Sequence, residues 1–242
     1  MAYVTLSSKA IGSTIKLKVN GSARNFIVVH QGKPSSVYDD SCNGTWLLMQ
    51  DIYENRAWHS SNTNDYANST IHSYLNSTFL NLFESNIKNA IKQVKLPYRK
   101  GSGTSTTVTG GSNGLSAKIF LLSATETSFD FSYMPSGEGA ELAYFKGCAD
   151  NSSDSKRVAY LNGSATDWWL RSPLCVSSSR YALYVGSDGD GHGVICSNSY
   201  GIRPALKIPS DLLLDSADKP DLSEVPTDTL LEEIRRRVVD KA

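Results

Sequence analysis

Alternating apolar and polar residues predict a β-hairpin near the start of the chain. From Thr14 to Val19 every second residue is apolar, which is the period of a half-buried strand. Asn20 and Gly21 follow, and both residue types tolerate the positive φ angles of a tight hairpin turn. The apolar run at residues 26–29 then supplies the returning strand.

Four shorter stretches have the length and composition of further strands. Residues 46–49 and 119–122 are continuous apolar runs, which predict buried strands. Residues 181–185 and 193–196 flank the glycine- and aspartate-rich connection GSDGDGH. We expect these two stretches to form a second hairpin.

Helical periodicity is confined to one region. Over residues 69–94 the apolar positions recur at steps of three and four, which predicts two helices with a break near Asn76 and Ser77. Residues 99–118 are instead rich in Gly, Ser and Thr and are expected to form an exposed, mobile loop. Many short strands, two helices and long loops together predict an α+β domain.

We expect residues 1–210 to form one ligand-binding domain and residues 211–242 to form a tail. The tail begins as an acidic, proline-containing linker and ends in a short helix with a capping box at residues 229–232. Leu230, Ile234 and Val238 share one face of this helix. A helix of about a dozen residues is unstable alone in water, so it should dock on its own domain or on a partner chain, for example in a homo-oligomer.

The charge balance argues against two classes of partner. Lys plus Arg and Asp plus Glu both total 24, so the net charge is zero and no long-range field attracts nucleic acid or anionic lipid. The first residues lack the pattern of a signal peptide, and no run approaches the roughly 20 apolar residues of a membrane span. We expect a soluble protein made in a cytoplasm, with no nucleic-acid partner and no membrane insertion.

The cysteines and the aspartates are the candidate metal ligands of the sequence. Four cysteines form no C-x-x-C pair and are expected to be mostly buried thiols. Asp188 and Asp190 resemble the start of a calcium loop, but the twelfth position of an EF-hand loop beginning at Asp188 is Ser199 and not the required Glu. We favour a polar hairpin tip, and a weaker, irregular cation site stays open.

No residue pattern predicts catalysis or a cofactor. The histidines, His30, His59, His72 and His192, occur in unrelated contexts without a G-x-S-x-G elbow. The glycine-rich segment lacks the Gly-Lys-Ser/Thr ending of a phosphate-binding loop. We therefore expect a protein that is not an enzyme and has no cofactor or metal, with a Cys/His pair assembled in space as the alternative.

Two sequence motifs carry a resemblance to a known family. They are W-W-L-R-S-P at residues 168–173 and G-I-R-P-A-L at residues 201–206. Further motifs precede them at residues 58–61, 74–80 and 120–126. Over most of residues 14–208 the chain resembles a domain family of unassigned biochemical function that is common in gut Firmicutes and their prophages.

This resemblance implies a C-type-lectin-like fold of the kind found in formylglycine-generating enzymes. It also implies kinship with the variable proteins of diversity-generating retroelements, in which adenine-directed mutagenesis rewrites a region that binds new ligands. The implied function is that of a hypervariable ligand- or receptor-binding protein of a gut-bacterial phage or prophage, with a protein or glycan ligand on a bacterial surface. The implied location is the phage tail, or the bacterial cytoplasm before assembly.

The composition of one segment agrees with such rewriting. Adenine mutagenesis of Asn codons that end in a pyrimidine never yields Lys, Glu, Gln, Met or Trp, and none of these occurs over residues 175–200. We place the variable segment at about residues 177–200, where Tyr, Ser and Asn make a mixture typical of antibody paratopes. About half of it should face the ligand, because alternate residues of a strand point to opposite faces. The predicted ligand-binding residues are Arg180, Tyr181, Tyr184, Ser187, Asp188, Asp190, His192, Val194, Ile195, Ser197, Asn198 and Tyr200.

The two motifs at residues 168–173 and 201–206 are expected to form a scaffold around this segment. Adjacent tryptophans bury large areas, and guanidinium groups bind carboxylates or backbone carbonyls in a fixed geometry. The predicted scaffold residues are Trp168, Trp169, Arg171 and Arg203.

Two other functions stay open. An oxidase or hydrolase on a formylglycine-generating-enzyme-like scaffold would use Cys148, Cys175 or Cys196. A calcium-dependent carbohydrate-binding adhesin would hold its ion at Asp188 and Asp190.

Overall fold

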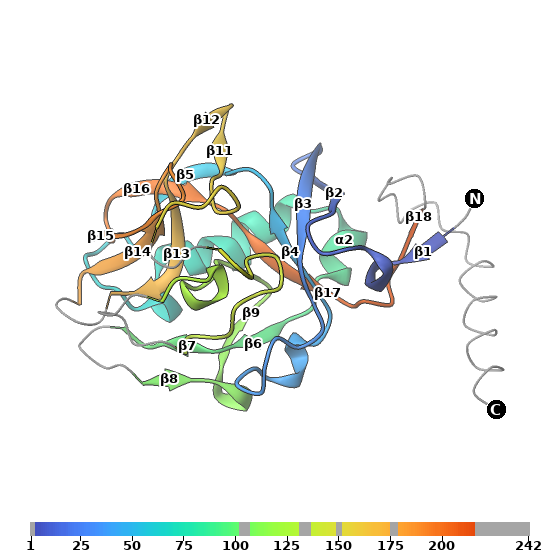
Figure 1. Ribbon diagram of the computed structural model, residues 1–242, viewed down its shortest axis with the longest axis horizontal. Coiled ribbons are helices and arrows are strands. Elements are labelled where there is room, and N and C mark those ends of the chain that lie inside the picture. The colour runs from blue at the N-terminus through green and yellow to red at the C-terminus, as the bar shows by residue number, and fades with distance from the viewer. Residues whose placement is uncertain (1–2, 102–106, 131–136, 149–151, 175–178, 216–242) are drawn as a thin grey trace.

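Two five-stranded sheets form the framework of the domain (Figure 1). The computed structural model describes residues 3–101, 107–130, 137–148, 152–174 and 179–215. The first sheet has the strand order β10-β17-β4-β3-β2 and the second sheet the order β15-β14-β13-β16-β5. The predicted tail helix, Cys175 and residues 177–178 of the variable segment lie outside the described residues.

The first sheet contains the predicted N-terminal hairpin. Asn20 and Gly21 take φ angles of 50° and 74° between its two strands, so the hairpin and its Asn-Gly turn are confirmed. The expected strand at residues 46–49 is also present, and all five positions of β4 are buried. The strands of this sheet are β2 (Thr14–Val19), β3 (Ser22–Gln31), β4 (Thr45–Met49), β10 (Ile119–Phe120) and β17 (Ala205–Ile208).

The second sheet brings together the two motifs at residues 168–173 and 201–206. Its strands are β5 (Glu54–Ala57), β13 (Trp168–Pro173), β14 (Tyr181–Val185), β15 (Gly191–Ile195) and β16 (Ser199–Ile202). β13 and β16 run parallel, with Trp168 opposite Gly201. A Cβ atom on Gly201 would lie 2.7 Å from Cγ2 of Ile52, so the close approach at this strand depends on glycine. The antiparallel pairing of β14 with β15 confirms the second predicted hairpin.

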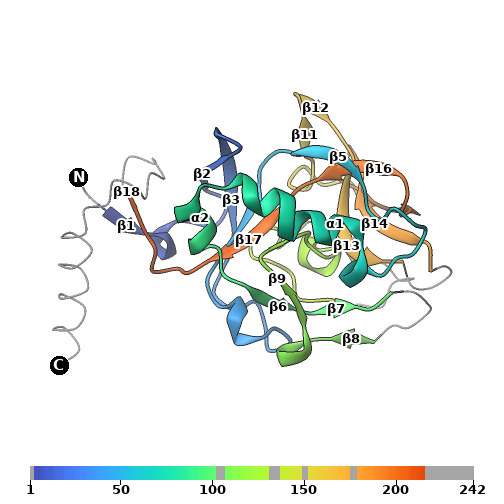
Figure 2. The ribbon, with the colours of Figure 1, turned by 180° about the vertical axis from the view of Figure 1, so that it is seen from behind.

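The helical segment crosses the back of the molecule (Figure 2). The predicted break near Asn76 and Ser77 is wrong, because the chain continues there as a π-helical turn. The interruption comes at Phe83, where ψ is 144° and a β-bridge joins Val19. A contact with a distant strand therefore ends the helical run. Its parts are α1 (Thr70–Tyr74), the π-helical η4 (Leu75–Phe79), the 3₁₀-helical η5 (Leu80–Leu82) and α2 (Ser85–Ala90).

The predicted α+β class is wrong, because the domain is mainly β. Strands account for 36% of the residues and helices for 18%, and the described ranges contain only two α-helices, both short. Part of the Gly/Ser/Thr-rich segment expected to be a loop forms strands instead, since Leu115 and Ala117 are buried. The strand pairs that result are β6 (Val94–Leu96) with β9 (Leu115–Ala117) and β7 (Tyr98–Arg99) with β8 (Val108–Thr109).

Short elements complete the described chain. β1 pairs with β18, so the packed structure continues through residue 215, while the predicted division at residue 210 stays a prediction. No helix in the described ranges is long and apolar enough to cross a bilayer. The remaining elements are β1 (Tyr3–Thr5), β11 (Tyr160–Leu161), β12 (Ser164–Ala165), β18 (Leu213–Asp215), and the 3₁₀ turns η1 (Leu6–Ser8), η2 (Asp40–Cys42), η3 (Tyr66–Asn68), η6 (Gly111–Asn113) and η7 (Thr125–Thr127).

Buried apolar residues cover both faces of the second sheet. Trp169 belongs to the largest cluster, together with Trp58 and Phe79. Its neighbour Trp168 belongs to a separate cluster with Leu183. Adjacent strand residues point to opposite faces, so the tryptophan pair anchors the sheet from both sides.

Candidate functional site

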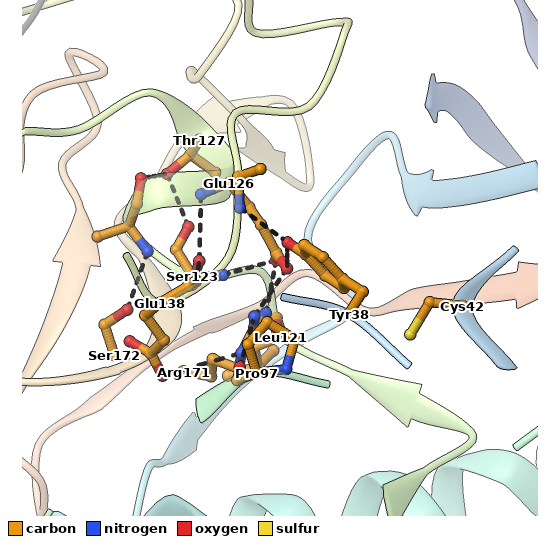
Figure 3. A network of polar contacts seen from close by, with 12 residues as sticks. Tyr38, Cys42, Pro97, Leu121, Ser123, Glu126, Thr127, Glu138, Arg171 and Ser172 are labelled. Carbon is orange, nitrogen blue, oxygen red and sulfur yellow. Dashed lines mark hydrogen bonds and ion pairs between the residues drawn. The ribbon is translucent and has the colours of Figure 1, made fainter. Parts of the chain in front are cut away.

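A buried ion pair holds the motif of residues 168–173 on β13 in place. Arg171 is fully buried, and its Nη1 and Nη2 atoms donate to the Glu126 carboxylate at 2.5 and 2.7 Å (Figure 3). The same guanidinium donates to the carbonyl oxygens of Leu121 and Pro97 at 3.0 and 3.2 Å. A buried charge left without its partner costs about 3–5 kcal/mol. Arg171 therefore ties β13 to Pro97 and to the chain around Leu121 and Glu126.

Further buried groups complete the shell of Glu126. The Tyr38 hydroxyl donates to its Oε1 atom at 2.7 Å, and the Ser123 N–H donates to its Oε2 atom at 3.0 Å. The Tyr38 oxygen also accepts the Ala140 N–H at 3.0 Å. Burial raises the pKa of Tyr38 well above its ordinary value, so the hydroxyl keeps its proton and remains a donor.

A second carboxylate adjoins this network. Oε1 of Glu138 accepts the backbone N–H of Arg99 at 3.2 Å and lies 3.9 Å from Nε of Arg171. Burial raises the pKa of Glu138, and the charges of Arg171 and Arg99 oppose that rise. Arg171, Glu126 and Glu138 are at most 1% exposed, so this network supports the sheet and offers no access to a substrate.

The other predicted scaffold residues connect strands. Nε1 of Trp169 donates to the Arg56 carbonyl oxygen at 2.8 Å. Nε of Arg203 donates to the Met49 carbonyl oxygen at 3.0 Å, and its guanidinium lies 5.0 Å from the ring centroid of Trp168. Burial lowers the pKa of Arg203 to about 10. Because Met49 ends β4 and Arg203 follows β16, this side chain joins the two sheets.

Aromatic side chains from several strands of the second sheet lie next to one another at the boundary between buried and exposed residues. The centroids of Tyr184 on β14 and Tyr200 on β16 are 4.5 Å apart, and that of His192 on β15 is 5.4 Å from Tyr184. β13 runs between the two tyrosine strands, and the buried ring of Trp169 lies 5.0 Å from Tyr200 and 6.1 Å from Tyr184. Such separations are favourable for aromatic pairs. We call these four residues the aromatic face; both tyrosines are half-buried and His192 is exposed.

A charged edge adjoins the aromatic face. Arg56 on β5 stands opposite Tyr200 in the strand register, and its guanidinium lies 3.6 Å from the ring centroid of Tyr74. Nη2 of Arg56 also forms an ion pair with Glu54 at 2.8 Å. Burial, together with the charge and hydrogen bond of Glu54, raises the pKa of Tyr74 to about 12. The sequence analysis did not predict Glu54, Arg56 or Tyr74 as site residues. The available signal was the short polar strand in which Glu54 and Arg56 occupy alternate positions.

The structure gathers some predicted ligand-binding residues and separates others. Tyr184, His192 and Tyr200 meet on the aromatic face, and Val194 lies on the same side of the sheet, packed against the core. Tyr181 and Ile195 pair with each other on the opposite side.

The remaining predicted residues lie in connections outside the aromatic face. Arg180 is exposed directly before β14, and Ser187 is exposed in the turn after it. Ser197 and Asn198 occupy the turn between β15 and β16.

The aspartates of the hairpin tip stabilise its turn. Oδ1 of Asp188 accepts the Asp190 N–H at 3.0 Å, and Oδ1 of Asp190 accepts the Gly191 N–H at 2.7 Å. The hydrogen bond from Asp190 lowers the pKa of Asp188. Gly189 takes a φ of +86°, and a Cβ atom there would lie 2.2 Å from the carbonyl oxygen of Asp154. Within the described ranges no three His, Cys, Asp or Glu side chains gather as a metal site would require.

The described cysteines are buried free thiols, as expected. They are Cys42, Cys148 and Cys196. Burial raises the pKa of Cys42 to about 11 and that of Cys196 to about 12, and it also raises the pKa of Cys148. Because the thiolate is the nucleophile, these environments disfavour the hydrolase or oxidase alternative for the three described thiols.

Comparison with known proteins identifies the family. Residues 43–210 match the family described as Domain of unknown function (DUF6273). The chain belongs to this family. The DUF6273 match spans every strand of the second sheet, and therefore the whole aromatic face. Searches of curated proteins and of solved structures find no match.

Proposed function

We propose that this DUF6273 domain is a ligand-binding protein that uses the aromatic face and the Arg56–Tyr74 pair beside it. The contact between Tyr184 and Tyr200, two half-buried rings on strands of the second sheet, carries the proposal. Tyrosine rings present flat apolar surface with a hydroxyl group at the rim, and they lose little conformational entropy on binding.

The proposed ligand is a glycan or protein on a bacterial surface. Glycans and proteins both offer C–H groups that pack on aromatic rings and polar groups that bond to hydroxyls. Burial and the neighbouring Tyr200 raise the pKa of Tyr184 to about 12, so its hydroxyl is neutral and able to donate at physiological pH. Glu54 and Arg56 pair with each other, which favours ligands without a large net charge.

The proposal extends to a retroelement-diversified receptor-binding protein of a gut-bacterial phage. It is supported by the family resemblance of the two motifs at residues 168–173 and 201–206. It is also supported by the absence of Lys, Glu, Gln, Met and Trp over residues 175–200. Tyr184, His192 and Tyr200 fall within this segment. The flanking DNA tests the extension: a reverse-transcriptase gene and a repeat that differs from the segment only at adenines are expected. Flanks without such a repeat would leave a ligand-binding domain of fixed sequence.

Binding to cells tests the aromatic face itself. Fluorescently labelled protein should bind saturably to some members of a panel of gut bacteria, and Tyr184→Ala and Tyr200→Ala should each weaken binding at least about tenfold, as interface hot spots do. Tyr160→Ala is the matched control, because Tyr160 is an exposed tyrosine on β11. Folded variants that bind as tightly as the wild type would contradict the proposal.

A further inference from the structure

A cavity lies between the helical segment and β9, and none of its lining residues belongs to the aromatic face. Its volume is about 320 Å³, at the small end of the range of ligand pockets. Since one water molecule occupies roughly 30 Å³ in the liquid, the cavity has room for a ligand of about ten non-hydrogen atoms. One wall includes Asn76, which belongs to the π-helical turn η4, and such turns occur often at functional sites.

The polar lining of the cavity is rich in donors and includes no carboxylate. Lys118, Gln93 and Ser116 line the cavity, and their side chains carry an ammonium, an amide and a hydroxyl group. No ion pair within the described ranges includes Lys118. Lys118 is therefore the one lysine or arginine among the lining residues, and none of those residues is acidic.

His72 adds an imidazole ring to the lining. The Asn76 amide is oriented by its own bonds, because Oδ1 accepts the Lys118 N–H at 2.7 Å and Nδ2 donates to the Ile119 carbonyl oxygen at 2.9 Å. Nδ2 of Asn76 also donates to the His72 carbonyl oxygen at 3.0 Å and lies 3.4 Å from Nδ1 of the same residue. Burial lowers the pKa of His72, which keeps the ring neutral near pH 7.

We propose that this cavity binds a small organic carboxylate, with Lys118 as the counter-ion and the donors of His72, Gln93 and Ser116 around the carboxylate oxygens. Leu80 and Ala117, which also line the cavity, contact the apolar part of the ligand. A charge-assisted hydrogen bond to an ammonium is stronger than one between neutral groups, so the charge of the ligand determines its affinity.

Benzoate and its neutral isostere benzamide separate charge from shape. Each has about nine non-hydrogen atoms and fits the volume estimated above. In an NMR titration of the full chain, benzoate should give saturable shifts centred on His72 and Lys118, with a Kd on the order of 1 mM. Benzamide should bind at least about tenfold more weakly, a difference of about 1.4 kcal/mol.

Substitutions at two lysines complete the test. Lys118→Met keeps the aliphatic stem and should weaken benzoate binding at least about tenfold, whereas Lys16→Met, at an exposed position of β2, should leave it unchanged. Tyr200→Ala should also leave it unchanged, so this result is independent of the proposed function. Unsaturable shifts, or equal affinity of Lys118→Met and wild type for benzoate, would overturn the proposal.

Discussion

Glu138 links the protonation of one residue to the stability of the domain. Because its folded pKa is raised, the folded state holds this proton more tightly than the unfolded chain does. The linked stability is fully present below the unfolded pKa of about 4.3, and it is lost as the pH rises through the folded pKa. Glu138→Gln keeps the shape of the side chain and removes the ionisation.

We therefore expect the free energy of unfolding of the wild type, relative to Glu138→Gln, to fall as the pH rises above the unfolded pKa of about 4.3. Urea denaturation across this range measures the difference. Glu141→Gln is the control for the same substitution at an exposed position. If the unfolding free energies of Glu138→Gln and wild type changed with pH in the same way, Glu138 would have the same pKa in the folded and unfolded states, which would contradict this prediction.

Individual residues of the site differ in how far the sequence could predict them. Tyr184 and Tyr200 were predictable because they lie in one segment with a distinctive composition. Arg56 and Tyr74 were not, because they come from much earlier in the chain and only the pairing of β5 with β16 brings Arg56 to Tyr200. No local pattern contains that pairing.

Among the elements, η4 is fixed to the first sheet by one side chain. Asn76 accepts the backbone N–H groups of Lys118 and Ile119 and donates to the Ile119 carbonyl oxygen. We expect Asn76→Ala to lower the free energy of unfolding by about 1–3 kcal/mol, because partly buried backbone groups lose their partners. Asn89→Ala, at an exposed position of α2, should change it by less than about 0.5 kcal/mol.

Thermal and chemical denaturation of both variants test this role. An Asn76→Ala protein as stable as the Asn89→Ala protein would mean that solvent replaces the lost hydrogen bonds without cost.

Elements with local causes were predictable, and those with distant causes were not. The β2–β3 hairpin follows from Asn20 and Gly21, which supply the turn themselves. The end of the helical run at Phe83 depends on a bridge to Val19, and the strands within residues 99–118 depend on pairing with β6 and β7. Long-range pairing therefore changed the class from α+β to mainly β.

The proposed binding site is built from one hairpin and its neighbours, so assembly of the whole molecule should matter for adhesion. A site made of one hairpin and its neighbours would bury less than the roughly 800 Å² per partner of a standard interface. Several copies acting together can raise the apparent affinity by about 10²–10⁴. We propose that the tail at residues 227–240 provides this assembly, either as a homo-oligomer or by attachment to a phage structural partner.

Light scattering on the purified protein tests the homo-oligomer. The full chain should be oligomeric, whereas a truncation after Ser216 should be monomeric and keep its thermal stability. A monomeric full chain would remove the tail from self-assembly and leave attachment to a different protein as its proposed role.

The parallel pairing of β13 with β16 has a practical consequence. Because the two strands are parallel, no tight turn can join them. Their connection contains β14 and β15, which belong to the same sheet and bury Ala182, Leu183 and Val185. Protein engineers could thus treat the domain as a display handle in which exposed positions of this connection, such as Ser187 and Ser197, are recoded while the tryptophan and arginine anchors remain in place.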